Sequence, residues 1–462
     1  HALASVYVES GREKEADTLV ERILEQDPGN VNGRLLKARL LFTAGDFSKS
    51  AQVLNALITD HPTFSNAHYY LGLVKLALNK DQEAKKSLLT HVTYSPGNRN
   101  ARIILAQIYI SNGLPDLALE QLDSVSADNR RHYRSYVLRG RAYGLKGNFE
   151  KAKRAYTQAI DVGPQKATAY YELAVLHRRQ KNVENAFDNV EETLRRSPRH
   201  IPAIAMKVSL LLNQNKEETA TSFLDEQLTR HKEDQSVLSA LHEIRGRLFF
   251  SRKDYAKSES ALKQAIELNP DLVSPYVLLA RIYTRTGKTQ KAIDQYHRLI
   301  EKRPDHIQAH MALGAIHDAA GNQAGARQAY EKILKINPDF APAANNLAWL
   351  LLQSEGKSDR ALRLARKAKS QLPDDPSVAD TMALAYIAKG LYDSAISELQ
   401  DALGKMPNNP TIRYHLGLAY WKNNEKAPAA ENLESALRME GNFPERRQAT
   451  ELLKEIKGSR FP

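Results

Sequence analysis

Prolines recur along this chain at a nearly constant interval of 34 residues. The prolines that keep the interval are Pro28, Pro62, Pro96, Pro164, Pro198, Pro270, Pro304, Pro338, Pro373 and Pro407. Their successive separations are 34, 34, 68, 34, 72, 34, 34, 35 and 34 residues, so one proline is missing from each of the two long steps. A fixed period of this kind is typical of a repeat array, in which each unit packs on its neighbours. At ~150 residues per domain the chain length would suggest three domains. The repeats indicate a periodic array instead.

Small residues keep the same register when each unit is numbered so that its proline is position 32. Position 8 is small in Ala4, Ala38, Gly72, Ala106, Gly140, Ala174, Gly246, Ala280, Gly314, Ala348, Ala383 and Gly417. Position 20 is small in nearly every unit, and position 11 is often aromatic, as in Tyr109 and Tyr143. Apolar residues spaced by three and four lie on both sides of turns such as Gly45-Asp46. Each unit is therefore predicted to be two closely packed helices and a proline stop.

One unit shows the full pattern in Tyr170, Leu173, Ala174, Ala186 and Pro198. Because this pattern recurs, the chain resembles the tetratricopeptide repeat family over essentially its whole length. The resemblance implies an all-α, right-handed superhelical solenoid of about thirteen helix-turn-helix repeats with a C-terminal capping helix. The expected repeats are 1–30 (first helix truncated), 31–64, 65–98, 99–132, 133–166, 167–200, 201–238, 239–272, 273–306, 307–340, 341–375, 376–409 and 410–443.

The unit 201–238 departs from the pattern and suggests a division of the array. It is four residues too long, has Val208 at position 8, and has Lys232 where proline belongs. We therefore predict a kink or loose joint near 229–238. The expected domains are an N-terminal array over 1–238 (repeats 1–7), a C-terminal array over 239–443 (repeats 8–13), and a capping helix with tail over 444–462.

Function is expected in a groove lined by the first helices. Helical spacing places positions 2, 5, 6, 9 and 12 of each first helix on one face. The family resemblance implies that this face lines the concave side of the solenoid. Binding residues are therefore sought at these positions.

The middle of this groove is predicted to be basic. Units 133–306 hold 31 Lys and Arg against 21 Asp and Glu, a net charge of +10 out of +12 for the chain. The candidate partner-binding arginines are Arg141, Arg178, Arg179, Arg247, Arg281 and Arg285. The alternative is that each arginine pairs with a carboxylate on an adjacent helix, which is worth ~0–1 kcal/mol at an exposed site.

Toward the C-terminus the groove positions become apolar and aromatic. The candidates there are Asn345, Asn346, Trp349, Tyr414 and Trp421. Tryptophan and arginine are over-represented among residues that dominate interface energetics. We therefore predict a bipartite site, with an acidic part of the ligand in the middle and an apolar or aromatic part near the end. The alternative for Trp349 and Trp421 is packing between repeats.

No motif predicts catalysis. The chain has no cysteine, which excludes thiolate nucleophiles and cysteine-ligated zinc. His242-Glu243 begins like a zinc-protease helix, but Gly246 stands where the second histidine belongs. His310 and His317 occupy positions 4 and 11, where packing explains them. We predict no enzyme activity, no cofactor and no metal. Basic residues alternate with acidic ones without an aromatic ladder, so no nucleic-acid partner is predicted.

The sequence also bears on location. No apolar run approaches the ~18 residues that span a bilayer, and residues 1–4 read as the middle of a helix. We therefore expect a longer precursor, with membrane association only through an N-terminal anchor outside this sequence.

A narrower resemblance covers about 341–443, carried by the runs 343–351, 373–381 and 410–417. These runs are similar to the C-terminal repeats of bacterial lipoproteins associated with exopolysaccharide export and exosortase-type surface-protein sorting. The resemblance implies a periplasmic location in preference to a cytoplasmic one. We predict a non-catalytic scaffold of a bacterial envelope assembly that binds protein or peptide partners in its groove. The alternative is a carrier or chaperone for an anionic polysaccharide or an exported chain.

Overall fold

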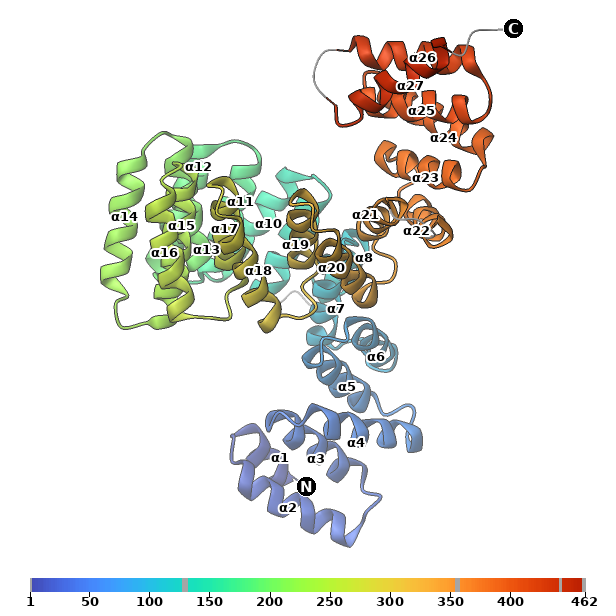
Figure 1. Cartoon of the computed structure of the whole chain (residues 1–462). Coiled ribbons are helices and arrows are strands. Elements are labelled where there is room, and N and C mark those ends of the chain that lie inside the picture. Colours follow the sequence, from blue (N-terminus) through green and yellow to red (C-terminus); the bar gives the residue numbers. More distant parts are fainter. Residues whose placement is uncertain (1, 127–131, 354–357, 440–442, 459–462) are drawn as a thin grey trace. The chain divides into compact units, whose positions relative to one another are not determined.

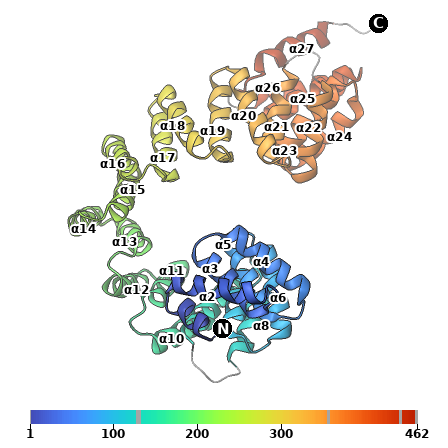
Figure 2. The ribbon, with the colours of Figure 1, turned by 90° about the horizontal axis from the view of Figure 1, so that it is seen from below.

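The computed structural model describes residues 2–126, 132–353, 358–439 and 443–458, and in these residues all regular secondary structure is α-helix. The described chain contains 27 helices, and consecutive helices run antiparallel, joined by short turns (Figures 1 and 2). The predicted all-α repeat fold is confirmed. By their contacts the residues form two compact units, 1–226 and 227–462. The division falls inside α14 (Glu217–Arg230).

The first thirteen helix pairs match the thirteen expected repeats. The helices of repeats 1–7 are α1 (Ala2–Glu9), α2 (Glu13–Gln26), α3 (Val31–Thr43), α4 (Phe47–Asp60), α5 (Ser65–Ala77), α6 (Asp81–Tyr94), α7 (Arg99–Ser111), α8 (Pro115–Ser126), α9 (Tyr133–Leu145), α10 (Phe149–Val162), α11 (Ala167–Arg179), α12 (Val183–Arg196), α13 (Ile201–Asn213) and α14. The helices of repeats 8–13 are α15 (Gln235–Ser251), α16 (Tyr255–Leu268), α17 (Val273–Arg285), α18 (Thr289–Lys302), α19 (Ile307–Ala319), α20 (Gln323–Ile336), α21 (Ala341–Leu352), α22 (Ser358–Gln371), α23 (Pro376–Ala388), α24 (Tyr392–Lys405), α25 (Pro410–Lys422) and α26 (Lys426–Arg438). The capping helix is α27 (Arg446–Gly458).

The segment near 229–238, where a kink or loose joint is predicted, adjoins the division between the two units and forms a hydrogen-bonded turn. The amide of His231 donates to the carbonyl of Gln227 at 3.0 Å, and the amide of Asp234 donates to that of His231 at 2.9 Å. Asp234 then caps α15, accepting a hydrogen bond from the amide of Val237. The four additional residues lengthen α15 to 17 residues, against 13 in α17. An extra helical turn therefore absorbs the insertion.

The turn inside each repeat depends on one backbone conformation. Wherever position 15 is described, its residue has positive φ, as in Gly45 at 80° and Lys181 at 59°. In the second repeat the amides of Gly45 and Asp46 donate to the carbonyls of Phe42 and Leu41 at 3.1 and 2.9 Å. These bonds satisfy carbonyls that the end of α3 leaves free, and glycine adopts this conformation at least cost.

Position 8 is the point of closest approach between the two helices of a repeat. A Cβ atom added to Gly140 would lie 2.3 Å from the ring of Tyr156, and one added to Gly314 would lie 2.4 Å from the ring of Tyr330. Both tyrosines are almost fully buried. The recurring small residue therefore allows a large side chain on the second helix to pack against the backbone of the first.

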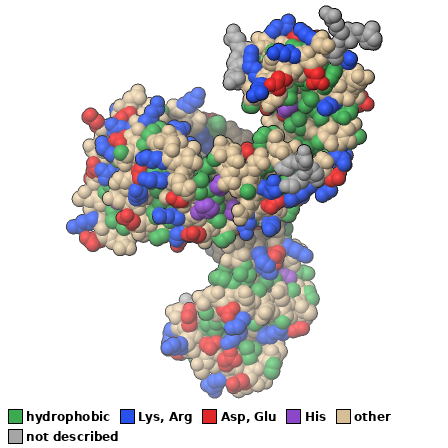
Figure 3. All heavy atoms as spheres, viewed as in Figure 1, with side chains coloured by type: hydrophobic (Ala, Val, Ile, Leu, Met, Phe, Trp, Pro, Cys, Tyr) green, Lys and Arg blue, Asp and Glu red, His purple; other side chains and the backbone are tan. Residues whose placement is uncertain are grey.

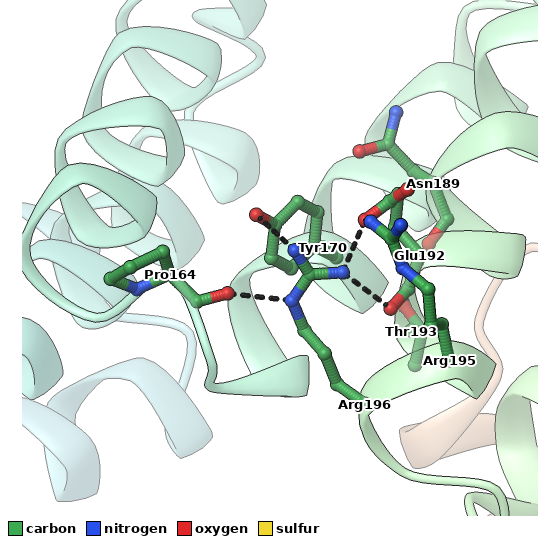
Figure 4. Close-up of polar contacts among 7 residues, drawn as sticks. All are labelled: Pro164, Tyr170, Asn189, Glu192, Thr193, Arg195 and Arg196. Atoms are coloured by element: carbon green, nitrogen blue, oxygen red, sulfur yellow. Dashed lines mark hydrogen bonds and ion pairs between the residues drawn. The ribbon is translucent and has the colours of Figure 1, made fainter.

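Arg196 fastens the joint between the repeats 133–166 and 167–200 (Figure 4). Its Nε donates to the carbonyl of Pro164 at 2.6 Å, and its Nη2 donates to the hydroxyl of Tyr170 at 2.9 Å. Its Nη1 donates to the carbonyl of Glu192 at 2.9 Å and also pairs with that residue's carboxylate. The guanidinium lies 3.9 Å from the centre of the Tyr170 ring. One side chain thus connects α12, α11 and the turn before α11.

We expect the free energy of unfolding to decrease as the pH falls from about 7.5 to about 5.5. Burial lowers the pKa of His91, whose Nδ1 contacts the Ser65 carbonyl at 2.8 Å. In the unfolded chain the imidazole keeps its ordinary pKa near ~6.5, so the unfolded state binds more protons below that pH. The stability that the neutral ring contributes is complete above that value and is lost as the pH falls through the lower folded-state pKa. Burial lowers the pKa in the same direction for His132, His177, His200 and His242.

Urea unfolding midpoints across this pH range measure the effect. The variant His91→Gln removes one of the titrating rings, so its midpoint should depend less steeply on pH than that of the wild type. A midpoint that stays constant over the range, or a variant with an unchanged slope, would contradict the assignment.

Candidate functional site

Within each unit several first helices of neighbouring repeats contact one another. In residues 1–226 these contacts join α7 with α9 and α9 with α11, and in residues 227–462 they join α15 with α17, α21 with α23, and α23 with α25. Of the helices that carry the predicted site, α9 therefore adjoins α11 and α15 adjoins α17, while α23 contacts both α21 and α25. Arg141, Arg178 and Arg179 belong to the first unit, and the other eight predicted residues belong to the second.

Arg141 of α9 is paired with a carboxylate. Its Nε and Nη2 both donate to one oxygen of Glu172 on α11, at 2.8 and 2.6 Å. The hydroxyl of Tyr156 donates to the other oxygen of Glu172 at 3.4 Å. Burial, with the Glu172 carboxylate as a second cause, raises the pKa of Tyr156. The pairing alternative therefore describes Arg141, whose guanidinium links two first helices.

Arg178 and Arg179, at the end of α11, are exposed. Among the described residues neither forms an ion pair with a carboxylate. Arg179 lines a pocket of about 180 Å³ that also contains Arg141, Tyr156 and Glu172. One guanidinium of this pocket is thus neutralised, and the other is open to an anionic group.

Three of the predicted arginines of the second unit lie on α15 and α17. Arg247 donates through Nη2 to a carboxylate oxygen of Glu243 at 2.6 Å and to the hydroxyl of Ser274 at 2.7 Å. Arg281 and Arg285 have no carboxylate partner in the described part of the chain, and both are exposed.

Phe250 holds these two unpaired arginines. The guanidinium carbons of Arg281 and Arg285 lie 5.4 and 5.3 Å from the centre of its ring. Such contacts are worth ~0.5–1 kcal/mol at exposed sites and restrict both guanidinium groups. We call Phe250, Arg281 and Arg285 the α15–α17 cluster. Lysine and arginine side chains are visible over this part of the surface in Figure 3.

Two residues that matter at these sites were not among the sequence candidates. Glu172 stands at position 6 and Phe250 at position 12 of their units, and both positions belong to the predicted groove face. A search of groove positions for carboxylates and rings next to the arginines would have found them.

The predicted aromatic part of the site is only partly open. In α21 the Nδ2 of Asn345 donates to Oδ1 of Asn346 at 3.4 Å, and Trp349 is 38% exposed. In α25, by contrast, Tyr414 and Trp421 are partly buried against a core cluster that α26 and α27 supply. The packing alternative describes Trp421, while Trp349 remains available to a ligand.

The described residues lack two further features. No group of three or more histidine and acidic side chains there is arranged to hold a metal ion. In those same residues no helix combines the length and the apolar character needed to cross a bilayer.

Profiles of the tetratricopeptide repeat match most of the chain. Three of them, each described as "Tetratricopeptide repeat", match residues 7–76 and 319–385, residues 137–200 and 277–341, and residues 241–272 and 410–443. A fourth, described as "TPR repeat", matches 383–424. The chain is a tetratricopeptide repeat protein.

Curated relatives of this tetratricopeptide repeat protein are distant. The TPR repeat-containing protein MJ1428 of Methanocaldococcus jannaschii is 22% identical over 328 residues, which cover 64% of this chain and 56% of the relative. The cellulose synthase operon protein C of Pseudomonas fluorescens is 29% identical over 153 residues, covering 30% and 12%. The lipopolysaccharide assembly protein B of Escherichia coli is 22% identical over 231 residues, covering 48% and 58%. The matches thus span little more than half of these relatives, and much less of the second.

One solved structure aligns with nearly the whole chain at low similarity. The crystal structure of the APC/C hetero-tetramer Cut9–Hcn1 aligns with a TM-score of 0.41 and 15% sequence identity, over 92% of this chain and 96% of that one.

Proposed function

We propose that this tetratricopeptide repeat protein is a non-catalytic scaffold that binds acidic segments of protein partners along its first helices. The observation that carries the proposal is the α15–α17 cluster, in which Phe250 holds two exposed guanidinium groups without a carboxylate partner. Groups already held in position lose little conformational entropy when a ligand binds. Guanidinium groups also bind carboxylates in a bidentate manner.

We expect the double substitution Arg281→Glu and Arg285→Glu to weaken binding of an acidic peptide by at least about tenfold, because it removes two charge-assisted contacts of ~1.5–3 kcal/mol each. The probe is fluorescein-labelled hexaglutamate, measured by fluorescence anisotropy with the full chain. Circular dichroism checks that the variant keeps its helicity, as expected for exposed side chains.

The matched control is Arg363→Glu with Arg366→Glu, which reverses two exposed arginines on the second helix α22. It changes the net charge equally, so a general electrostatic attraction would weaken both variants alike. The proposal requires the control to bind within about twofold of wild type. Equal losses in both variants, or no saturable binding by the wild type, would refute it.

The second candidate is a carrier or chaperone for an anionic polysaccharide, which the same unpaired arginines favour. Polygalacturonate serves as the probe. Affinity for a flexible polyanion should fall steeply as ionic strength rises, because screening acts on every charge along the chain. An interface that also uses Trp349 should retain most of its affinity in salt, and Trp349→Ala should weaken it. These two responses distinguish the candidates.

We further propose that the scaffold serves a bacterial envelope assembly, in exopolysaccharide export or surface-protein sorting, and acts in the periplasm. The names of the Pseudomonas and Escherichia coli relatives refer to cellulose synthesis and lipopolysaccharide assembly, which supports this assignment. Cell fractionation of the native host, followed by immunodetection of the protein, tests it. Recovery in the cytoplasmic fraction alone would overturn it.

A further inference from the structure

A pocket lined by three histidines lies between α18, α19 and α20 in the second unit. Its volume is about 420 Å³, within the range of small-molecule sites. The polar residues that line it are His297, His310, His317, Gln328, Glu331, Lys332 and Lys335, and the apolar ones are Ile300, Leu313 and Ala329. Figure 3 shows histidine side chains gathered where these helices lie in Figure 1. Two of the three helices are second helices, so this pocket differs from the first-helix surface discussed above.

The pocket lies where this repeat lacks a side-chain pairing that three other repeats have. Three repeats place a lysine at position 19 against an aromatic ring at position 11. These pairs are Tyr143 with Lys151, Phe249 with Lys257, and Tyr283 with Lys291, at 5.5, 5.6 and 5.8 Å from ring centre to Nζ. The repeat 307–340 has His317 and Gly325 instead. A Cβ on Gly325 would lie 2.8 Å from the His317 ring. Glycine therefore allows the ring to pack against the α20 backbone, and its missing side chain leaves the pocket open.

Hydrogen bonds fix which ring nitrogen of His317 carries the proton. Oδ1 of Asn322 accepts from the amide of Gly325 at 3.0 Å, which identifies the other terminal atom of Asn322 as the donor Nδ2. This Nδ2 lies 3.2 Å from Nδ1 of His317, which therefore accepts. The neutral ring must then carry its hydrogen on Nε2, and Nε2–H is a donor without a partner in the described chain.

The charge balance of the pocket is positive. Lys332 and Lys335 are exposed and form no ion pair within the described residues. The carboxylate of Glu331 is engaged by Nη2 of Arg360 at 2.7 Å. His310 is 6% exposed, and its Nε2 donates to the carbonyl of Pro304 at 3.0 Å. The pocket is thus lined by hydrogen-bond donors and cations. Its one lining carboxylate, that of Glu331, is paired with Arg360.

We propose that this pocket binds a small organic anion, with a phosphate or carboxylate group held by Lys332, Lys335 and His317 and an apolar body against Ile300 and Leu313. The chemistry follows from the donors, because two ammonium groups and an imidazole N–H all favour an anionic acceptor. The apolar lining residues would contact the uncharged part of the ligand.

Isothermal titration calorimetry of the full chain with phenyl phosphate and benzoate tests the proposal, with phenol as the neutral analogue. We expect saturable binding of an anionic probe at one site and none of phenol. Lys332→Glu with Lys335→Glu should raise the Kd at least about tenfold, while the control pair on α22, Arg363→Glu with Arg366→Glu, should leave it within about twofold. Because all four side chains are exposed, both variants should retain their helicity.

A second variant fills the space instead of changing its charge. His317→Tyr with Gly325→Lys restores the ring and lysine pair of the other repeats, adds a positive charge, and should nevertheless abolish binding. No saturable binding of either anionic probe, or undiminished binding to this filled variant, would overturn the proposal. Binding of labelled hexaglutamate alone, lost in the Lys332→Glu, Lys335→Glu variant, would also overturn it and assign the surface to an acidic protein segment.

Discussion

Gly140→Ala should lower the free energy of unfolding by about 2 kcal/mol, although alanine is the better helix former. The new methyl group would lie 2.3 Å from the ring of Tyr156, which is 3% exposed. The ring is held by its buried packing, and its hydroxyl donates to Glu172. Overpacking therefore outweighs the gain in helix propensity. The unfolding midpoint in urea measures the loss.

Gly144→Ala is the matched control for this substitution. Gly144 lies one turn later on α9, and nothing would lie within 4 Å of its new Cβ. Here the helix propensity acts alone, so a gain of up to about 1 kcal/mol is expected. Opposite signs for the two variants support close packing at position 8. A shift of the same sign and size in both would contradict it.

Arg196→Ala should lower the free energy of unfolding by about 3 kcal/mol, because it leaves partly buried acceptors without a donor. The guanidinium bonds the carbonyl of Pro164, the hydroxyl of Tyr170 and the backbone and carboxylate of Glu192, and its side chain is only 12% exposed. Arg196→Lys should recover little of the loss, since an ammonium lacks the planar fork that reaches these groups together.

Arg195→Ala provides the comparison within the same helix. Arg195 also pairs with Glu192, but its side chain is 68% exposed. Exposed ion pairs of this kind contribute ~0.2–1 kcal/mol. Thermal and urea unfolding of both variants should therefore separate by about 2 kcal/mol or more. Losses of equal size would mean that Arg196 does not fasten the joint.

The repeat fold was predictable because the local requirements for packing and for the turn recur at the same positions of each unit. Position 8 must be small where a side chain such as Tyr156 or Tyr330 packs against it, and position 15 must tolerate positive φ. The structural effect of the four-residue insertion in 201–238 was not predictable in the same way. A residue count does not reveal whether four extra residues bend a turn or extend a helix, and here α15 gained the residues.

The candidate site was predictable in its location and less so in its chemistry. Arg141 and Arg281 both stand at position 9, yet one is paired with Glu172 and the other contacts Phe250. The difference depends on which side chain the adjacent first helix presents, and that requires the register between repeats. Tyr414 and Trp421 differ from Trp349 for a similar reason, because core residues of α26 and α27 cover them.

The arrangement of helix contacts also governs how the chain can acquire its structure. In the described residues the principal contacts join helices that are one or two places apart in chain order. Low sequence separation keeps the entropic cost of loop closure small and favours rapid folding. Early repeats can therefore fold on the ribosome before later ones have been synthesised.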